Sequence, residues 1–489
     1  MLAQKFIIKV FASILSSVFM FVSLLIMTRY VGSEYGVMMW GWAMVGLIST
    51  ISDLGFDAAS VKFISEGRDL NACISTHLFL KSALIGTFFL ITMAYLAFSI
   101  FTESISQEKT TLVVIFVAYY VIANFTWVII RVFDGRLEAT KSSVIQASEA
   151  IARSSILIML ALLGSSAVIL SMGYVCGAVF SAVIALYLFR KVGYKPVRPA
   201  YLRDYIVFAR PIAVGLFLVM AISFFDRVIV EFFWNTAELG YYSVTMGLVY
   251  AATAIGVALN YVLLPKFSEL FSAGDRGMAE SVLWKSEKFI SILFIPVIIF
   301  MLVFGDSIAT VLFGADFAPA GRVVSILSLY IYLNIMLGIL TQVLYSTNNS
   351  RLYRNSTIAY AASAFILLII LVPENIGGVA LAGLGASGAA VAITIGNLVF
   401  ITLINHYVRA KTGLSLHRGL IRQLIAAAAV FAVVFLVWGG GMFGLLPLLL
   451  LLLLCFALFG ALLFLLKEMN MDDIRFILSA LNLRKMNEN

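Results

Sequence analysis

Charged residues, cysteine and histidine are all scarce in this sequence, and each scarcity excludes a class of protein. Of the 489 residues, 12% are charged and 62% are hydrophobic, whereas soluble domains carry about 25% charged residues. A soluble protein of this length could not cover its surface with so few charges. Disorder is excluded too, because the chain also holds 39 Phe and 20 Tyr. The three cysteines and three histidines are scattered, which excludes a disulfide framework and matches no metal-ligand spacing.

Nucleotide-binding motifs and long loops are also missing. The phosphate-binding run G-x-x-x-x-G-K-S/T does not occur, so we expect that the protein does not itself hydrolyse ATP. No stretch between the apolar runs is long enough for an extramembrane catalytic domain, and no pattern is typical of nucleic-acid binding. We therefore predict a protein that is not an enzyme, holds no cofactor or metal and has no nucleic-acid partner.

Apolar runs dominate the sequence, and many are long enough to cross a bilayer. A membrane-spanning helix needs about 20 predominantly apolar residues. Fourteen runs approach this length; they centre on residues 9–28, 36–53, 78–101, 112–130, 146–163, 167–189, 206–226, 241–264, 289–305, 323–346, 357–373, 384–406, 423–438 and 446–466. Trp438 and three glycines join the last two, which is typical of a tight hairpin. The sequence therefore predicts an all-α polytopic membrane protein with about 14 transmembrane helices.

The distribution of Lys and Arg predicts which side of the membrane each loop faces. With the N-terminus in the cytoplasm, all but four of the 33 Lys and Arg residues fall on the inner side, as the positive-inside rule requires. The four on the outer side are Arg29, Lys109, Arg227 and Arg322. We expect a multi-pass protein of the cell membrane (inner or plasma membrane) with both termini cytoplasmic.

The two halves of the chain resemble each other at a constant offset. Glu34-Tyr35-Gly36 aligns with Glu238-Leu239-Gly240, and Lys62-Phe63 aligns with Lys266-Phe267. Parallel six-helix repeats with the substrate path between them are a known transporter plan. We predict two such lobes around a central cavity, followed by extra helices. The expected parts are an N-terminal six-helix lobe (1–200), a C-terminal six-helix lobe (201–410), two additional transmembrane helices (411–467) and a cytoplasmic tail (468–489).

Several short segments, taken in order, resemble a known family. They are Arg29-Tyr30-Val31-Gly32-Ser33-Glu34-Tyr35-Gly36, Ser52-Asp53-Leu54-Gly55, Phe63-Ile64-Ser65-Glu66, Phe225-Asp226-Arg227, Glu238-Leu239-Gly240-Tyr241-Tyr242, Leu264-Pro265-Lys266-Phe267-Ser268, Leu312-Phe313-Gly314 and Gly385-Ala386-Ser387-Gly388-Ala389-Ala390. In this order and spacing they are similar to the landmarks of polysaccharide-biosynthesis or O-antigen-type flippases. Those proteins belong to the multidrug/oligosaccharidyl-lipid/polysaccharide (MOP) exporter superfamily.

This resemblance implies a mechanism and a cargo. Members have twelve core helices in two lobes around a central cavity and work by alternating access. The implied cargo is an oligosaccharide linked to a polyprenyl phosphate or pyrophosphate, moved from the cytoplasmic to the outer leaflet for the assembly of surface polysaccharide. The expected partners are this lipid-linked oligosaccharide, membrane lipids, H+ or Na+ as a coupling ion, and a polysaccharide polymerase and glycosyltransferases.

Charged residues at the predicted spans are the candidates for cargo binding. A charge inside a bilayer is costly and usually faces a cavity, and arginine suits a lipid phosphate because its planar fork binds two oxygens. The candidates are Arg29, Arg131, Glu149, Arg153 and Arg227. Glu149 and Arg153 share one helix face and could line the cavity or only neutralise each other. Arg29 could equally be a snorkelling anchor at the end of its span. For Arg131 the favoured alternative is that it only follows the positive-inside bias.

Three acidic residues are candidates for ion coupling. Asp53 and Asp57 lie one turn apart at the inner end of the second span, and Asp226 closes the seventh span. The alternative for all three is helix capping and salt bridges between lobes. Gly55, between the first two, indicates a turn there.

Two other functions compete with the flippase. An ion-coupled exporter of drugs or organic cations, from the same superfamily, would need a net acidic cavity, whereas arginines are present here. A membrane-embedded glycosyl polymerase or transferase would need catalytic groups on sizeable outer loops, and the outer loops here are short and poor in charge.

Overall fold

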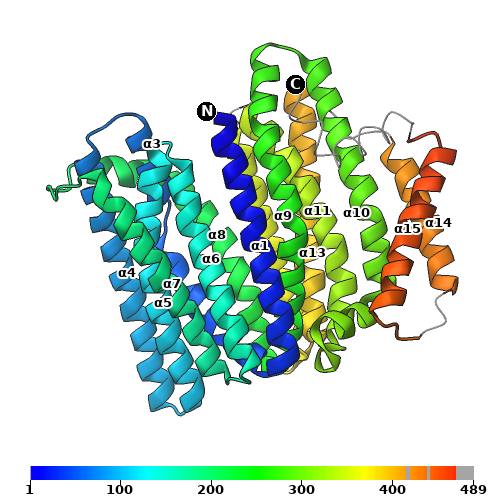
Figure 1. Cartoon of the computed structure of the whole chain (residues 1–489), viewed down its shortest axis with the longest axis horizontal. Helices are drawn as coiled ribbons and strands as arrows, with labels where there is room; N and C mark the ends of the chain where they lie inside the picture. The colour runs from blue at the N-terminus through cyan, green and yellow to red at the C-terminus, as the bar shows by residue number, and fades with distance from the viewer. Residues whose placement is uncertain (1, 348, 415–418, 438–440, 470–489) are drawn as a thin grey trace.

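The chain folds almost entirely into helices in a computed structural model, which describes residues 2–347, 349–414, 419–437 and 441–469 (Figure 1). The α-helices are α1 (Leu2–Val31), α2 (Glu34–Ser49), α3 (Phe56–Ser65), α4 (Leu70–Phe101), α5 (Gln107–Gly135), α6 (Ala139–Leu162), α7 (Ala167–Phe189), α8 (Leu202–Phe233), α9 (Thr236–Ser272), α10 (Arg276–Phe313), α11 (Ala320–Ser346), α12 (Ser350–Leu371), α13 (Gly385–Thr412), α14 (Leu420–Val437) and α15 (Leu445–Leu465). Short 3-10 helices are η1 (Thr50–Ser52), η2 (Arg190–Val192) and η3 (Ala315–Phe317). Strands β1 (Asn375–Ile376) and β2 (Val379–Ala380) pair in the α12–α13 loop.

The predicted all-α class is confirmed, and each of the fourteen apolar runs overlaps one helix. Within the described residues, twelve helices are long and apolar enough to cross a membrane. The other two are α9, which is not among the twelve, and α14, whose apolar part is the shorter Arg422–Leu436. The number of fourteen crossings therefore stays a prediction. The expected cytoplasmic tail (468–489) and the glycine turn of the last hairpin lie largely outside the described residues.

Side chains just before several helices explain where those helices begin. Asp69 accepts a hydrogen bond from the backbone N–H of Ala72 at 2.7 Å and caps α4. Asn235 and Asp275 do the same for α9 and α10, accepting from Glu238 and Met278 at 2.9 Å each. These caps satisfy N–H groups that have no partner inside the helix.

One pair of contacts shows the internal repeat in three dimensions. The Glu34 carboxylate, on α2, accepts a hydrogen bond from the backbone N–H of Ala167 at the start of α7, at 2.8 Å. The Glu238 carboxylate, on α9, accepts one from Ala386 at the start of α13, at 2.9 Å. The two glutamates are the residues that align in the sequence repeat. The same contact is therefore made twice, once in each half of the chain.

The two halves touch where α2 and α9 begin. A Cβ placed on Gly36 would lie 2.1 Å from the carbonyl oxygen of Thr236, so only glycine allows this approach. Gly240 faces Gly36 across the same contact at an ordinary 3.5 Å. The two glycines align in the repeat, and their helices cross at the end of the molecule that the charge distribution assigns to the outer side.

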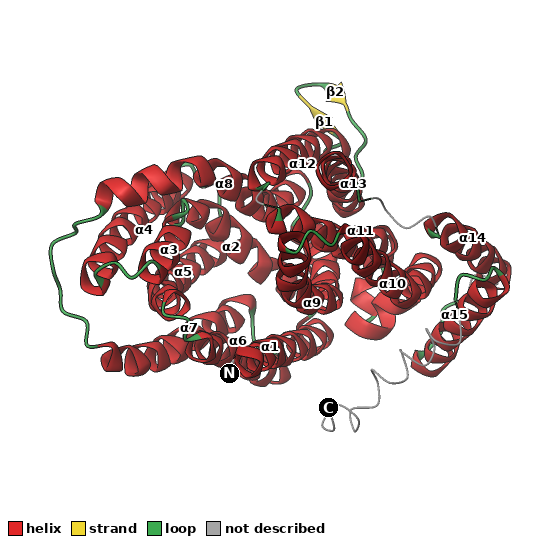
Figure 2. Cartoon of the chain, turned by 90° about the horizontal axis from the view of Figure 1, so that it is seen from above, coloured by secondary structure: helices red, strands yellow, loops and turns green. Residues whose placement is uncertain are grey.

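The last two described helices lie apart from the rest. Seen from above, α14 and α15 form a hairpin at one end of the molecule, next to α10 (Figure 2). Among the remaining helices, α1 packs against α6 of its own half and against α9 of the other half. Any central site must therefore be built from the first thirteen helices.

Candidate functional site

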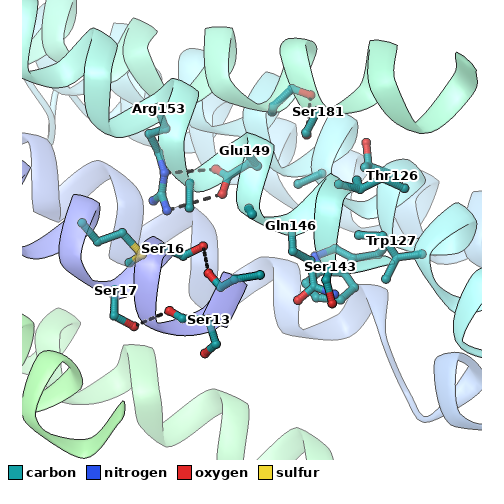
Figure 3. Close-up of a pocket in the computed structure, with 18 of the residues that line it drawn as sticks. Ser13, Ser16, Ser17, Thr126, Trp127, Ser143, Gln146, Glu149, Arg153 and Ser181 are labelled. Atoms are coloured by element: carbon teal, nitrogen blue, oxygen red, sulfur yellow. Dashed lines mark hydrogen bonds and ion pairs between the residues drawn. The ribbon is translucent and has the colours of Figure 1, made fainter. Parts of the chain in front are cut away.

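A chamber of about 380 Å³ lies between α1, α5, α6 and α7. Hydroxyl groups dominate its polar lining, and a few longer polar side chains join them (Figure 3). These residues are Ser13, Ser16, Ser17, Thr126, Ser143, Gln146, Glu149, Arg153 and Ser181, with the rings of Tyr119 and Trp127. A chamber with this lining suits a ligand rich in hydroxyl groups.

The serines of α1 and α6 offer the chamber unused hydrogen-bonding capacity. Ser16 and Ser17 donate to the carbonyls of Ala12 and Ser13, one turn earlier, at 2.8 and 3.0 Å. Their oxygen lone pairs therefore remain available as acceptors. The hydroxyl of Ser143 is buried and has no hydrogen-bond partner among the described residues.

The predicted Glu149–Arg153 pair lies in the wall of this chamber. The Nε of Arg153 is 3.0 Å from a carboxylate oxygen of Glu149, and a second guanidinium nitrogen lies 3.5 Å from the other oxygen (Figure 3). The guanidinium also stacks over the ring of Tyr174 at 4.9 Å. The pair is therefore ion-paired and also lines this chamber, and its role in cargo binding stays a prediction.

A second chamber of about 160 Å³ lies between the two halves of the chain and is lined from α1, α2, α6, α7, α8 and α9. Arg153, Ser17 and Met20 line both chambers. Arg227 contributes a second guanidinium from α8. The structure thus brings together two arginines that are 74 residues apart in sequence, one from each half.

Arg227 is held firmly but retains one unused donor. Its side chain is 1% exposed and lies 3.2 Å from a carboxylate oxygen of Asp226. It also donates to the hydroxyl of Tyr250 at 3.3 Å and stacks over Trp42 at 5.4 Å. Its Nε is buried without a hydrogen-bond partner among the described residues. A buried, unsatisfied N–H of a cation is a favourable donor for an anionic ligand.

The Asp226 carboxylate has little hydrogen-bonding capacity left for a ligand. One carboxylate oxygen accepts from the backbone N–H of Arg227 at 2.7 Å as well as from its guanidinium. The other accepts from the hydroxyl of Tyr242 at 2.6 Å. The carboxylate is therefore fully engaged in orienting Arg227, beside the second chamber.

Asp57 lies outside both chambers, in a buried ion cluster that sequence reasoning did not find. One of its oxygens is 3.2 Å from both His77 and Lys81 on α4, and the other is 3.2 Å from Arg131 on α5. Arg131 also contacts Asp134 at 3.2 Å and stacks over Trp127 at 4.7 Å. Lys81 is only 1% exposed, although the charge count treated it as an inner-surface cation. The sequence signal that could have revealed this cluster is the one-turn spacing of His77 and Lys81 within an apolar run.

Asp53 does not share a helix face with Asp57, because the chain turns between them at Gly55. Its carboxylate accepts hydrogen bonds from the backbone N–H groups of Gly55 at 3.1 Å and Asp57 at 3.4 Å. Asp53 thus stabilises the first turn of α3.

Arg29 also lies outside both chambers. It is exposed at the end of α1 and donates to the backbone carbonyls of Val311 and Leu312, the latter at 3.3 Å. These carbonyls belong to the last turn of α10, where a cation is favoured by the helix dipole. Arg29 therefore joins the first helix of one half to the third helix of the other.

Comparison with known proteins decides the family. A profile of the polysaccharide biosynthesis proteins matches residues 2–271, more than half of the chain. The chain belongs to this family. It is also 24% identical over 407 residues to the probable low-salt glycan biosynthesis flippase Agl15 of Haloferax volcanii, and the match covers 82% of each chain.

Solved structures share the architecture of this family member. The lipid II flippase MurJ in an inward closed conformation matches with a TM-score of 0.73 at 14% identity, covering 95% of this chain and 100% of that one. A multidrug resistance MATE family transporter of the MOP superfamily, in an inward-facing conformation, matches with a TM-score of 0.64 at 13% identity, covering 81% and 94%. These likenesses confirm the polytopic helical fold that the sequence resemblance implied.

Proposed function

We propose that this family member is a flippase that moves a polyprenyl-(pyro)phosphate-linked oligosaccharide from the cytoplasmic to the outer leaflet by alternating access. The observation that carries the proposal is that two neighbouring chambers share Arg153 in their walls. One chamber is rich in hydroxyl groups, and the other holds a second arginine between the two lobes. Such a pair of sites matches an amphiphile with a sugar part and a phosphate part.

The phosphate binds between Arg153 and Arg227. Both guanidinium groups are already charged, oriented and partly desolvated, so they can offer forked donors to phosphate oxygens. Arg227 supplies its unpartnered Nε, while Asp226 and Tyr250 hold the rest of the group in place. Arg153 can turn from Glu149 toward the phosphate because it lines both chambers.

The sugars occupy the chamber of α1, α5, α6 and α7. Ser16, Ser17 and Ser143 hydrogen bond to sugar hydroxyls, and Trp127 and Tyr119 offer flat apolar faces. The chamber belongs to the N-terminal lobe alone, while the phosphate site needs both lobes. Separation of the lobes would therefore release the phosphate contact before the sugar contact.

Contacts between the lobes on the predicted outer side hold this state closed to the outside. Gly36 packs against Thr236, and Arg29 donates hydrogen bonds to carbonyls in the last turn of α10. The Lys109 ammonium lies 2.5 Å from the Glu231 carboxylate. Alternating access requires these contacts to break. We assign Arg29 to this outer closure rather than to the cargo phosphate.

Transport is driven without ATP and is coupled to H+ or Na+. Asp226 is the acidic residue best placed for coupling, because it is buried and contacts Arg227, which lines the chamber between the lobes. Asp57 is less suited, since three basic side chains surround it, and Asp53 caps a helix. Polymerases and glycosyltransferases of the same surface polysaccharide are the expected partners.

An exporter of organic cations is the second candidate, favoured by the similarity to a MATE transporter and by Glu149 in the first chamber. The two chambers together hold two arginines and one glutamate, which favours an anionic cargo.

Binding of undecaprenyl diphosphate, undecaprenol and a lipophilic cation to the purified protein separates the two functions. The flippase predicts that only the diphosphate binds well, and that Arg227→Ala weakens it by about ten-fold or more, one charge-assisted contact being lost. Tight binding of the cation instead would overturn the flippase.

Orientation can be tested by cysteine labelling in a variant in which the exposed Cys176 is replaced. An impermeant thiol reagent added to sealed cells should modify Ala315→Cys, at the exposed start of η3, but not Lys195→Cys, in an exposed loop. The reverse result would place the termini outside and invert the direction of transport.

A further inference from the structure

A third cavity lies away from both chambers, between the C-terminal lobe and the α14–α15 hairpin. Its volume is about 1050 Å³, larger than either chamber. It is lined by the start of α9, α11 and α13, the last part of α10, and the end of α14. All of these helix ends lie on the side that the charge distribution assigns to the outer leaflet.

A kink in α10 shapes this cavity. Phe304 has non-helical backbone angles (φ −107°, ψ 23°) inside the helix. The hydroxyl of Ser325 on α11 donates to the carbonyls of Met301 and Leu302 at 3.1 and 3.2 Å, which satisfies groups that the kink loosens. After the kink, the Asp306 carboxylate lies against the backbone of Gly321, in the cavity wall.

The polar wall of the cavity offers one cation and one anion without protein partners. Three of the four outer cations are engaged, as described above: Arg29 with α10, Lys109 with Glu231 and Arg227 with Asp226. Arg322 and Asp306 are both exposed in the cavity, and neither forms an ion pair among the described residues. The remaining carboxylate, that of Glu238, is used by the start of α13.

The opposite wall is apolar. Phe431 and Phe435 from α14, Met442 from the hairpin and Leu302 from α10 line it and are exposed. A ligand that fits must therefore carry opposite charges at one end and a hydrocarbon body at the other. Unpaired charges at this depth are costly unless a ligand or water solvates them.

We propose that this cavity binds a phospholipid of the outer leaflet whose headgroup carries a phosphate and a primary ammonium, as in phosphatidylethanolamine. The phosphate accepts hydrogen bonds from Arg322, the ammonium donates to Asp306, and the acyl chains pack on Phe431 and Phe435. An anionic headgroup would meet the Asp306 carboxylate without a compensating cation. A choline headgroup has no N–H to donate. The lipid fills the space between the lobe and the hairpin.

Native mass spectrometry tests this directly. The full protein is taken from vesicles of equal parts phosphatidylethanolamine, phosphatidylglycerol and phosphatidylcholine into mild detergent, and the retained lipid is identified. Wild type should retain phosphatidylethanolamine preferentially. Arg322→Ala and Asp306→Asn should each weaken retention by about ten-fold or more, because each removes a charge-assisted contact. Arg322→Lys should retain an intermediate amount.

The matched control is Glu108→Gln, which removes an exposed carboxylate near the outer end of the other lobe, on α5. It should retain lipid as wild type does. Equal retention of phosphatidylglycerol, or of phosphatidylcholine, would overturn the assignment of the headgroup. Unchanged retention in both Arg322→Ala and Asp306→Asn would show that the lipid binds elsewhere.

A second measurement does not depend on removing a charge. In Met442→Trp, a phosphatidylethanolamine with brominated acyl chains should quench the added fluorescence more than the brominated phosphatidylglycerol does. Equal quenching by the two lipids would mean that the hairpin meets bulk lipid only, and would overturn the site.

Discussion

The two lobes share one plan but differ at the same point of their second helix. In the N-terminal lobe, α2 ends at Ser49, and the chain passes through η1 and Gly55 before α3 begins. Gly55 has a φ of 92°, a conformation that glycine adopts easily. In the C-terminal lobe the corresponding stretch is the single helix α9, which continues through Pro265.

This difference decides where the N-terminal lobe buries its ion cluster. The break turns α3 so that Asp57 reaches α4 and α5, where it meets His77, Lys81 and Arg131. The residue that aligns with Asp57 in the C-terminal lobe is Tyr261, which has no charge. The hydroxyl-rich chamber also lies in the N-terminal lobe. The repeated scaffold thus carries different polar sites in its two copies: the Asp57 cluster and the hydroxyl-rich chamber in the first, and the buried Asp226–Arg227 pair in the second.

The largest effect should follow from breaking the ion cluster. Asp57→Asn leaves the buried His77 and Lys81, and the partly exposed Arg131, without their carboxylate, and removal of one partner from a buried ion pair costs about 3–5 kcal/mol. We expect a much lower yield of folded protein and a lower melting temperature in detergent. Asp57→Asn with Lys81→Met should recover part of the loss. Asp204→Asn breaks a half-exposed pair with Arg68 and serves as the control, at about 1 kcal/mol or less. Equal stability of the Asp57 and Asp204 variants would show that the cluster contributes little.

The aligned glycines give the next test. Gly36→Ala puts a Cβ 2.1 Å from a carbonyl oxygen, whereas at Gly240 the nearest atom is 3.5 Å away. Gly36→Ala should force the lobes apart at their outer ends and cost about 1–3 kcal/mol, as overpacking does. Gly240→Ala should behave as wild type. Disulfide trapping across the outer ends, compared between the two variants, measures the difference. Similar trapping in both would mean that α2 and α9 do not meet in this way.

Arg153 and Arg29, both of the N-terminal lobe, should separate cargo binding from closure of the outer side. Arg153→Ala should weaken binding of undecaprenyl diphosphate by about ten-fold or more, because a charge-assisted contact is lost. Arg29→Ala should leave binding unchanged and alter only the transport rate, since it contacts α10 and neither chamber. If Arg29→Ala reached the membrane in normal abundance but bound undecaprenyl diphosphate more weakly, Arg29 would have to be assigned to the cargo-binding site.

The smallest effect should be the same in both lobes. Glu34→Ala and Glu238→Ala each remove a carboxylate from the start of a helix, worth about 1 kcal/mol. The two variants should lower the melting temperature by similar amounts, because they lose the same contact. A clear difference between them would show that one of these contacts has an additional role.

The sequence alone determined what depends on local pattern. Apolar runs placed the helices, and the aligned glutamates Glu34 and Glu238 marked the repeat, since both signals are carried by neighbouring residues. Glu149 and Arg153 were predicted as a pair because they lie one helical turn apart. Gly55 marked a turn because few residues other than glycine adopt its backbone angles.

Only the tertiary structure decided which charges share a site. Arg153 and Arg227, from different lobes, line the same chamber. Asp57 has its partners on two other helices. Arg29 contacts the end of α10 and lines neither chamber. Helical periodicity orients a side chain relative to its own helix, but not relative to a neighbour far away in sequence. The angle and depth at which the helices pack are set by the summed contacts of many side chains. That sum decided whether each arginine faces a chamber, a carboxylate or the end of another helix.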